Sequence, residues 1–280
     1  MHAFDGAARE GATAKALVLR PFSYTSCFAD DSALGVQHME DAERSPLEVS
    51  MRYVAFCDVL GFANAVQERF DETIELYNDF TRMMGNWEHA ENVQVVIYSD
   101  SILITSDELM PLLSAVQMLS FATLAHDLLI RGGVAYGRYW ERKESGNLFV
   151  VSDALVRAVK LESTVKIPAV AFSPEVEVPL KAWLPHFAGE VFSSPVLHFR
   201  NISVVNPFNQ FWFQSSRTRV GQMKERFPAH AAKYNWFLDL GQAVDNGELL
   251  VPQAVTDRLV ADGVIVWTPY PDEAAPKDVS

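Results

Sequence analysis

The strongest constraint on the fold is an apolar run that carries a single carboxylate. From Tyr53 to Phe62 the chain reads YVAFCDVLGF, and Asp58 is its only charged residue. A continuous apolar run is typical of a central strand that is covered on both faces. Burying an ionised carboxylate there costs several kcal/mol unless a partner offsets it. The sequence therefore predicts a central strand over residues 52–59 and a partner for Asp58.

A second run has the same character. Residues 95–104 read VVIYSDSILI, with Asp100 at the turn between two apolar halves. Two acids, each at the mouth of a strand, suit a pair of divalent cations that hold a triphosphate. The alternative is that Asp58 caps the following helix and Asp100 is an ordinary turn residue. The later run RGGVAYG over residues 131–137 favours the functional interpretation.

Hydrophobic periodicity predicts the order of the elements in this part of the chain. Helices are expected over residues 68–84, 108–130 and 154–162, and hairpins over 93–105 and 131–152. The order β-α-β-β-α-β-β-α predicts an α+β fold, in which an antiparallel-rich sheet has helices on one face.

The remaining segments divide the chain into four parts. We expect an irregular leader over residues 1–50, a catalytic domain over 51–175, a C-terminal α/β extension packed on the core over 176–270, and a disordered tail over 271–280. Within the extension the patterns predict strands over 191–199 and 202–205, helices over 217–227 and 228–244, a short helix over 251–261 and a last strand over 264–268.

The ordered motifs resemble a known family. Asp-x-x-Gly-Phe after a strand, Ser-Asp-Ser at a hairpin tip and Arg-Gly-Gly-x-x-x-Gly after a helix are similar to the catalytic domain of class III nucleotide cyclases. More closely, they resemble the pyrimidine nucleotide cyclases of Pycsar anti-phage systems. The resemblance implies a ferredoxin-like, palm-type core. It also implies conversion of UTP to cyclic UMP, a homodimer with sites assembled across the interface, and a separate effector that senses the product.

The resemblance assigns roles to residues of this chain. Two Mg²⁺ or Mn²⁺ ions per site are expected on Asp58, Asp100 and the backbone carbonyl of Val59. The backbone N–H groups of Leu60, Gly61 and Phe62 are expected to cradle the β- and γ-phosphates.

The chain departs from the family at other positions. The purine readers of the family fall on Val96 and near Phe149, which disfavours ATP and GTP and leaves Tyr53 or Tyr98 as a replacement reader. The transition-state asparagine is missing, because its position falls on Val156. Either Arg157 or Lys160 supplies a cation, or both are ordinary exposed helical residues.

These departures leave other functions open. The alternatives are a cytidylate cyclase that makes cyclic CMP from CTP, a degenerate cyclase fold that only binds nucleotides, and a palm-type nucleotidyltransferase. The basic residues Arg217, Arg219, Lys224, Arg226 and Lys233 either face phosphate or a partner subunit, or form a solvated helix face.

Composition bounds the partners. A formal charge of -13 argues against a general nucleic-acid-binding protein, because such binding neutralises phosphates with Lys and Arg. No apolar run approaches the roughly 20 residues that span a bilayer, and no secretory pattern is present, so we expect a cytoplasmic protein without membrane partners. Two cysteines form no disulfide framework, and Cys57 is expected to be a small buried hydrophobe.

Overall fold

The computed structural model describes residues 48–145, 147–249 and 251–265. The predicted tail over 271–280, most of the predicted strand over 264–268 and nearly all of the predicted leader over 1–50 lie outside these residues.

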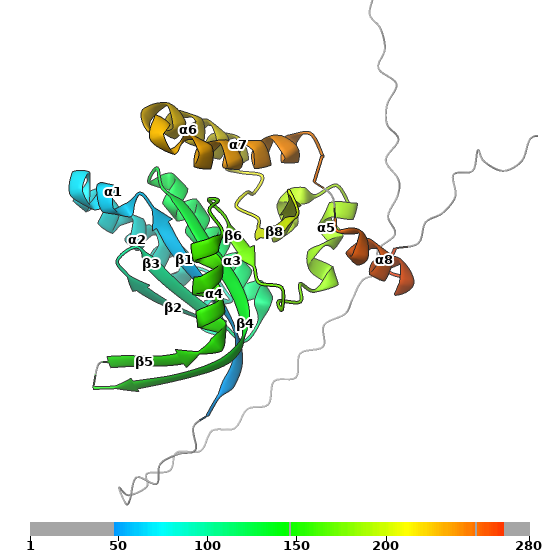
Figure 1. Ribbon diagram of the computed structural model, residues 1–280, viewed down its shortest axis with the longest axis horizontal. Coiled ribbons are helices and arrows are strands. Elements are labelled where there is room, and N and C mark those ends of the chain that lie inside the picture. The colour runs from blue at the N-terminus through cyan, green and yellow to red at the C-terminus, as the bar shows by residue number, and fades with distance from the viewer. Residues whose placement is uncertain (1–47, 146, 250, 266–280) are drawn as a thin grey trace, which may run out of the picture. The chain divides into compact units, whose positions relative to one another are not determined.

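The described residues form one mixed sheet in the strand order β2-β3-β1-β4-β6-β8-β7, and β5 pairs with β4 (Figure 1). Its strands are β1 Ser50–Leu60, β2 Val93–Tyr98, β3 Ser101–Ser106, β4 Leu129–Glu144, β5 Asn147–Ser152, β6 Val170–Phe172, β7 Val196–Phe199 and β8 Ile202–Val205. Every pair is antiparallel except β4 with β6. The predicted α+β class with an antiparallel-rich sheet is confirmed.

Eight α-helices and four short 3-10 helices lie among the described residues. The α-helices are α1 Phe62–Glu68, α2 Phe70–Gly85, α3 Leu109–Ala125, α4 Asp153–Thr164, α5 Leu184–Phe187, α6 Phe213–Arg226, α7 Ala231–Asp245 and α8 Gln253–Ala261. The 3-10 helices are η1 Ala90–Asn92, η2 Leu180–Ala182, η3 Val191–Ser193 and η4 Pro228–His230. Part of the strand predicted over 191–199 is therefore η3, and the helix predicted from Pro228 begins as η4. The helix predicted over 108–130 ends at Ala125, because β4 already begins at Leu129.

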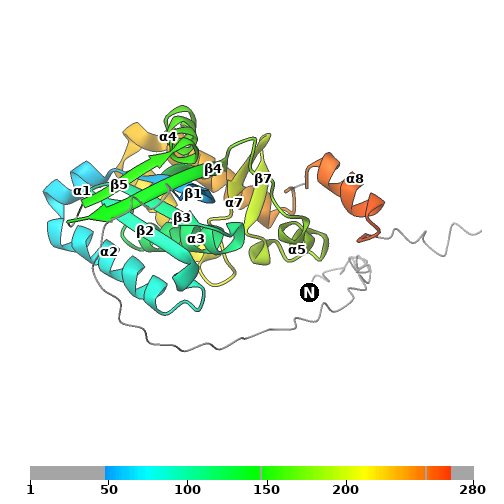
Figure 2. The ribbon, with the colours of Figure 1, turned by 90° about the horizontal axis from the view of Figure 1, so that it is seen from below.

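The helices lie on both faces of the sheet, which corrects the prediction of helices on one face (Figure 2). On β1, Ala55 and Cys57 belong to the apolar cluster under α2 and α3, whereas Val54 packs with Ala154 and Ala158 of α4. Successive strand residues face opposite sides, so an apolar β1 must be covered twice.

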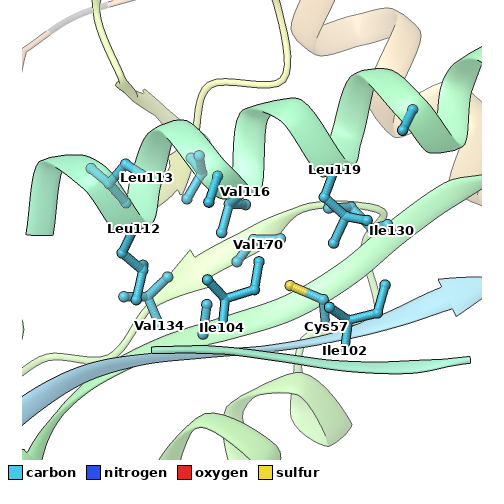
Figure 3. Close-up of a cluster of buried hydrophobic side chains, with 14 of the residues drawn as sticks. Cys57, Ile102, Ile104, Leu112, Leu113, Val116, Leu119, Ile130, Val134 and Val170 are labelled. Atoms are coloured by element: carbon cyan, nitrogen blue, oxygen red, sulfur yellow. The ribbon is translucent and has the colours of Figure 1, made fainter. Parts of the chain in front are cut away.

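The side of the sheet under α3 holds a large apolar cluster. Figure 3 shows Leu112, Val116 and Leu119 of α3 over the strand residues Cys57 and Ile102. Burial raises the pKa of the Cys57 thiol to about 12, which agrees with its prediction as a buried hydrophobe.

A second apolar cluster joins α6 and α7 to the sheet. Leu129 of β4, Ala171 of β6 and Val204 of β8 pack in one cluster with Phe237 and Leu240 of α7. These helices are therefore bound to the sheet near the start of β4, where the strand passes the end of β1. Over the residues described here, no helix is both long enough and apolar enough to cross a membrane.

Candidate active site

The register of β1 places a cation opposite the predicted carboxylate. Asp58 pairs with Ser101 of β3 on one side and with Arg131 of β4 on the other. Nη2 of Arg131 donates to Oδ2 of Asp58 at 3.1 Å and lies 2.5 Å from Oε1 of Glu162 on α4. The side chains of Asp58 and Glu162 are 23% and 10% exposed, so Arg131 is the partner that makes their burial tolerable.

One guanidinium does not fully compensate two carboxylates. Burial raises the pKa of Asp58, the charge of Arg131 opposes this, and the nearby charge of Asp100 raises the pKa further. Burial likewise raises the pKa of Glu162, with Arg131 opposing. The site therefore has excess negative charge, which favours the binding of an additional cation.

Asp100 is positioned by a tight turn between β2 and β3. Its backbone carbonyl accepts a hydrogen bond from the N–H of Val59 at 2.9 Å, which ties the turn to the end of β1. Ser99 has a φ of 56°, and its carbonyl accepts a hydrogen bond from the Tyr77 hydroxyl of α2. Burial and the charge of Asp100 both raise the pKa of Tyr77, which places its hydroxyl near that carboxylate.

Both carboxylates line one pocket of about 370 Å³. Its lining comes from the end of β1, the first turn of α1, the Asp100 turn, the start of β4 and the region of α6 and α7. The lining residues are Asp58, Val59, Leu60, Gly61, Phe62, Ala63, Asn64, Asp100, Leu129, Arg131, Met223, His230, Lys233 and Tyr234.

The turn from β1 into α1 suits a phosphate. Gly61 precedes α1 with a φ of 85°, a left-handed conformation that glycine adopts without strain. The first backbone N–H groups of a helix lack partners within the helix, and here they belong to the pocket-lining residues Phe62, Ala63 and Asn64.

Of the predicted site residues, the structure thus brings six to one pocket and leaves four elsewhere. The pocket contains Asp58, Val59, Leu60, Gly61, Phe62 and Asp100.

The two tyrosines lie outside the pocket. The ring centroids of Tyr53 and Tyr136 lie 4.5 Å apart. Tyr53 lies on the sheet face opposite Asp58, because the two residues are five positions apart along β1 and successive side chains alternate between faces. Tyr98 ends β2 and is 81% exposed. Neither side chain is placed to read a base in this pocket of its own chain.

The two α4 cations lie outside the pocket too. Arg157 pairs with Asp153 at 3.2 Å and with Glu175 at 2.7 Å, and it donates to the carbonyl of Tyr136. Lys160 is exposed on the same helix. A catalytic role for either residue therefore requires a site other than the one its own chain forms.

Sequence reasoning gave no role to Arg131 or Glu162, and it left open whether Lys233 faces phosphate, a partner subunit or solvent. Arg131 opens the Arg-Gly-Gly motif, but its pairing with Asp58 follows only from the register of β4. Glu162 lies in α4, where a helix was predicted over residues 154–162. An acid on the helix face that packs against the sheet is the sequence feature that could have identified it. Lys233 belongs to the basic cluster noted in the sequence, and only the packing of α7 brings it to the pocket.

The donor set fits a hard divalent cation. Among the described residues, no group of three or more His, Cys, Asp or Glu side chains could enclose a metal. The pocket offers two carboxylates instead, and Mg²⁺ typically uses one or two carboxylates and completes its shell with water and substrate phosphates. Asp58 and Asp100 therefore suit a metal that arrives with a nucleotide.

No protein-family model matches the chain, and no curated protein matches it. Solved structures that align with it include nucleotide cyclases. The adenylyl cyclase CyaB from P. aeruginosa is 15% identical over 59% of this chain and 98% of its own, with a TM-score of 0.39. The guanylyl cyclase Cya2 is 10% identical over 59% of this chain and 96% of its own, with a TM-score of 0.37.

A third structure contains a bound nucleotide analogue. It is the catalytic core of a rhodopsin-guanylyl cyclase with converted specificity, in complex with ATPalphaS. It is 16% identical over 45% of this chain and 80% of its own, with a TM-score of 0.37. Similarity of this degree does not establish an activity, so the case for one depends on the pocket residues.

Proposed function

We propose that this chain is a metal-dependent nucleotide cyclase that converts UTP to 3′,5′-cyclic UMP and pyrophosphate. The observation that carries the proposal is the convergence of Asp58 and Asp100 on one pocket that also contains Arg131 and Lys233. The two acids suit a metal ion, and Lys233 offers a positive charge to phosphate beside the Arg131 that pairs with Asp58 and Glu162.

The reaction joins the ribose 3′-oxygen to the α-phosphorus. The 3′-hydroxyl gives its proton to solvent water, its oxygen bonds to the α-phosphorus, and the bond from the α-phosphorus to the oxygen of the β-phosphate breaks, so that pyrophosphate leaves. Asp58 and Asp100 would hold Mg²⁺ or Mn²⁺, which would lower the pKa of the 3′-hydroxyl and offset the charge of the leaving group.

The chain supplies binding and orientation. Asp58 and Asp100 hold the metal, with the carbonyl of Val59 as a further ligand. The backbone N–H groups of Leu60, Gly61 and Phe62 hold phosphate oxygens at the start of α1. Arg131 is held between Asp58 and Glu162, so it offsets their charge and fixes the position of the Asp58 carboxylate.

The pyrimidine base is the most specific part of the proposal. Val96 occupies the position of the purine reader in the resemblance, and its side chain offers a base no hydrogen bond. The likeness to Pycsar cyclases supports UTP, a cytoplasmic anti-phage role for cyclic UMP and a separate effector. CTP is the second candidate substrate.

The position of α4 supports a homodimer within this proposal. Arg157 and Lys160 lie outside the pocket of their own chain, so they would reach a reacting nucleotide only from a second copy. We propose a catalytic domain over residues 51–175 and a C-terminal extension over residues 176–270, of which Met223, His230, Lys233 and Tyr234 line the pocket.

The direct test is product formation. Purified protein is incubated with each labelled nucleoside triphosphate and Mn²⁺ or Mg²⁺, and cyclic UMP with equimolar pyrophosphate is expected from UTP. Asp58→Asn or Asp100→Asn should lower the rate about a hundredfold or more. Asp71→Asn, which changes an exposed acid of α2, should retain the rate. No cyclic product from any of the four nucleotides would refute the proposal.

A binding module without catalysis is the second candidate, because the asparagine of the transition-state pair is replaced by Val156. Tight binding of a metal–nucleotide complex without turnover would favour this candidate. A linear dinucleotide product would instead indicate transfer between molecules.

A further inference from the structure

One wall of the Asp58 and Asp100 pocket is built by the C-terminal helices. Met223 of α6, His230 of η4, and Lys233 and Tyr234 of α7 all line it. Figure 1 shows α6 and α7 running side by side near the end of the sheet that carries α1. The motifs that carry the resemblance do not include this wall.

The wall is fixed to the core. Met223 and Tyr234 are buried in the same apolar cluster as Leu129 of β4. Arg219 of α6 also forms an ion pair with Asp127, in the turn that leads from α3 to β4. The backbone around Lys233 is therefore held by packing, and a charge on α7 has a defined place in the pocket.

Among the described residues, Lys233 has no acidic partner, and of the members of the basic cluster it is the one that lines the pocket. Arg217 pairs with Asp245, and Arg219 pairs with Asp127, so those two charges are already used. Lys233 lines the same pocket as Asp58 and Asp100. A strongly hydrated ammonium beside a polar pocket is well suited to bind phosphate oxygens.

We infer that Lys233 is a binding residue for the polyphosphate chain of the nucleotide, and that α7 thereby contributes to substrate binding. This inference rests on the proposed function, and it names a residue outside the motif-bearing part of the chain. Arg131 is already paired with Asp58 and Glu162, so Lys233 is the lining cation that can neutralise phosphate. A nucleoside triphosphate gains more from this charge than a diphosphate or a monophosphate does, because it is more negative.

The test measures binding without turnover. Isothermal titration calorimetry with inorganic tripolyphosphate and Mg²⁺ is carried out on the full chain and on Lys233→Gln. We expect binding to weaken about tenfold or more, because a charge-assisted hydrogen bond is lost. Lys233→Arg should retain binding within about threefold, since the charge remains. Lys224→Gln on α6, outside the pocket, should bind like the unaltered protein.

A kinetic measurement separates binding from a structural role. For Lys233→Gln we expect the KM for UTP to rise about tenfold while kcat changes less, provided that the melting temperature is unchanged. Equal tripolyphosphate binding by Lys233→Gln and the unaltered protein would overturn the inference, whether or not cyclic UMP forms. Weakened binding in Lys233→Gln, with no cyclic product from the unaltered protein, would support the inference and refute the cyclase.

Discussion

At the scale of single residues, Asp58 carries a charge that the fold disfavours. Because burial raises its pKa, the folded state binds the proton more tightly than the unfolded state does. The stabilising contribution of this group is complete below its unfolded pKa, and it is lost as pH rises through the raised folded value. We expect Asp58→Asn to abolish activity without lowering the melting temperature at pH 7. Any excess of the melting temperature of Asp58→Asn over that of the unaltered protein should become smaller as the pH is lowered toward 4.

Asp153 is the matched control for this prediction. It lies at the start of α4, and a hydrogen bond from Arg138 at 2.8 Å lowers its pKa. Its charged form therefore stabilises the fold above the unfolded pKa, and this contribution is lost as pH falls through the lowered value. Asp153→Asn should lower the melting temperature at pH 7. If Asp58→Asn lowers the melting temperature at pH 7 more than Asp153→Asn does, the charge of Asp58 does not destabilise the fold.

Tyr77 is a positioning residue for Asp100. Its hydroxyl donates to the carbonyl of Ser99, which has a left-handed backbone in the turn that presents the carboxylate. Tyr77→Phe removes a hydrogen bond worth about 1 kcal/mol and loosens that turn. We expect activity to fall about fivefold at limiting Mg²⁺ and to recover partly at high Mg²⁺.

The control is Tyr98→Phe, because Tyr98 lies next to Ser99 in the sequence but its side chain is 81% exposed. Its activity and Mg²⁺ dependence should equal those of the unaltered protein. If Tyr77→Phe shows the same Mg²⁺ dependence as Tyr98→Phe, Tyr77 does not position Asp100.

At the scale of elements, the packing of α4 on β4 depends on a glycine. A Cβ at Gly133 would lie 2.7 Å from the Ala158 carbonyl oxygen and 2.9 Å from Cβ of Leu161, so α4 would have to move. Gly133→Ala should lower the free energy of unfolding by about 1–3 kcal/mol. It should also lower activity, because α4 carries the Glu162 that contacts Arg131.

Gly85→Ala provides the comparison in chemical denaturation. Gly85 ends α2, and a Cβ there would meet nothing within 4 Å. This variant should be as stable as the unaltered protein, or more stable by up to about 1 kcal/mol. Equal stability of the two alanine variants would show that α4 tolerates the extra methyl group.

At the scale of the whole molecule, the location of α4 makes the dimer testable by mixing. If Lys160 acts on the pocket of a second copy, Asp58→Asn and Lys160→Ala each inactivate the homodimer. When equal amounts of the two variants exchange subunits, half of the dimers contain one chain of each variant. In each of these dimers one of the two sites has both Asp58 and Lys160, so about a quarter of the activity of the unaltered protein should return. Activity that stays at the level of the separate variants would contradict a site shared between chains.

The sequence alone determined the parts of the site that are local. The apolar run of β1 with its carboxylate, the hairpin with Asp100 at its tip and the glycine before α1 are each specified by a few consecutive residues. Strand alternation and turn chemistry act over such short distances, so these features could be read directly.

Only the tertiary structure decided which charges share the pocket. The register between β1 and β4 sets Arg131 opposite Asp58, the close approach of α4 adds Glu162, and the cluster under α7 brings in Lys233. These contacts join segments far apart in the chain, and their free energy depends on how whole elements pack, which no short stretch of residues encodes.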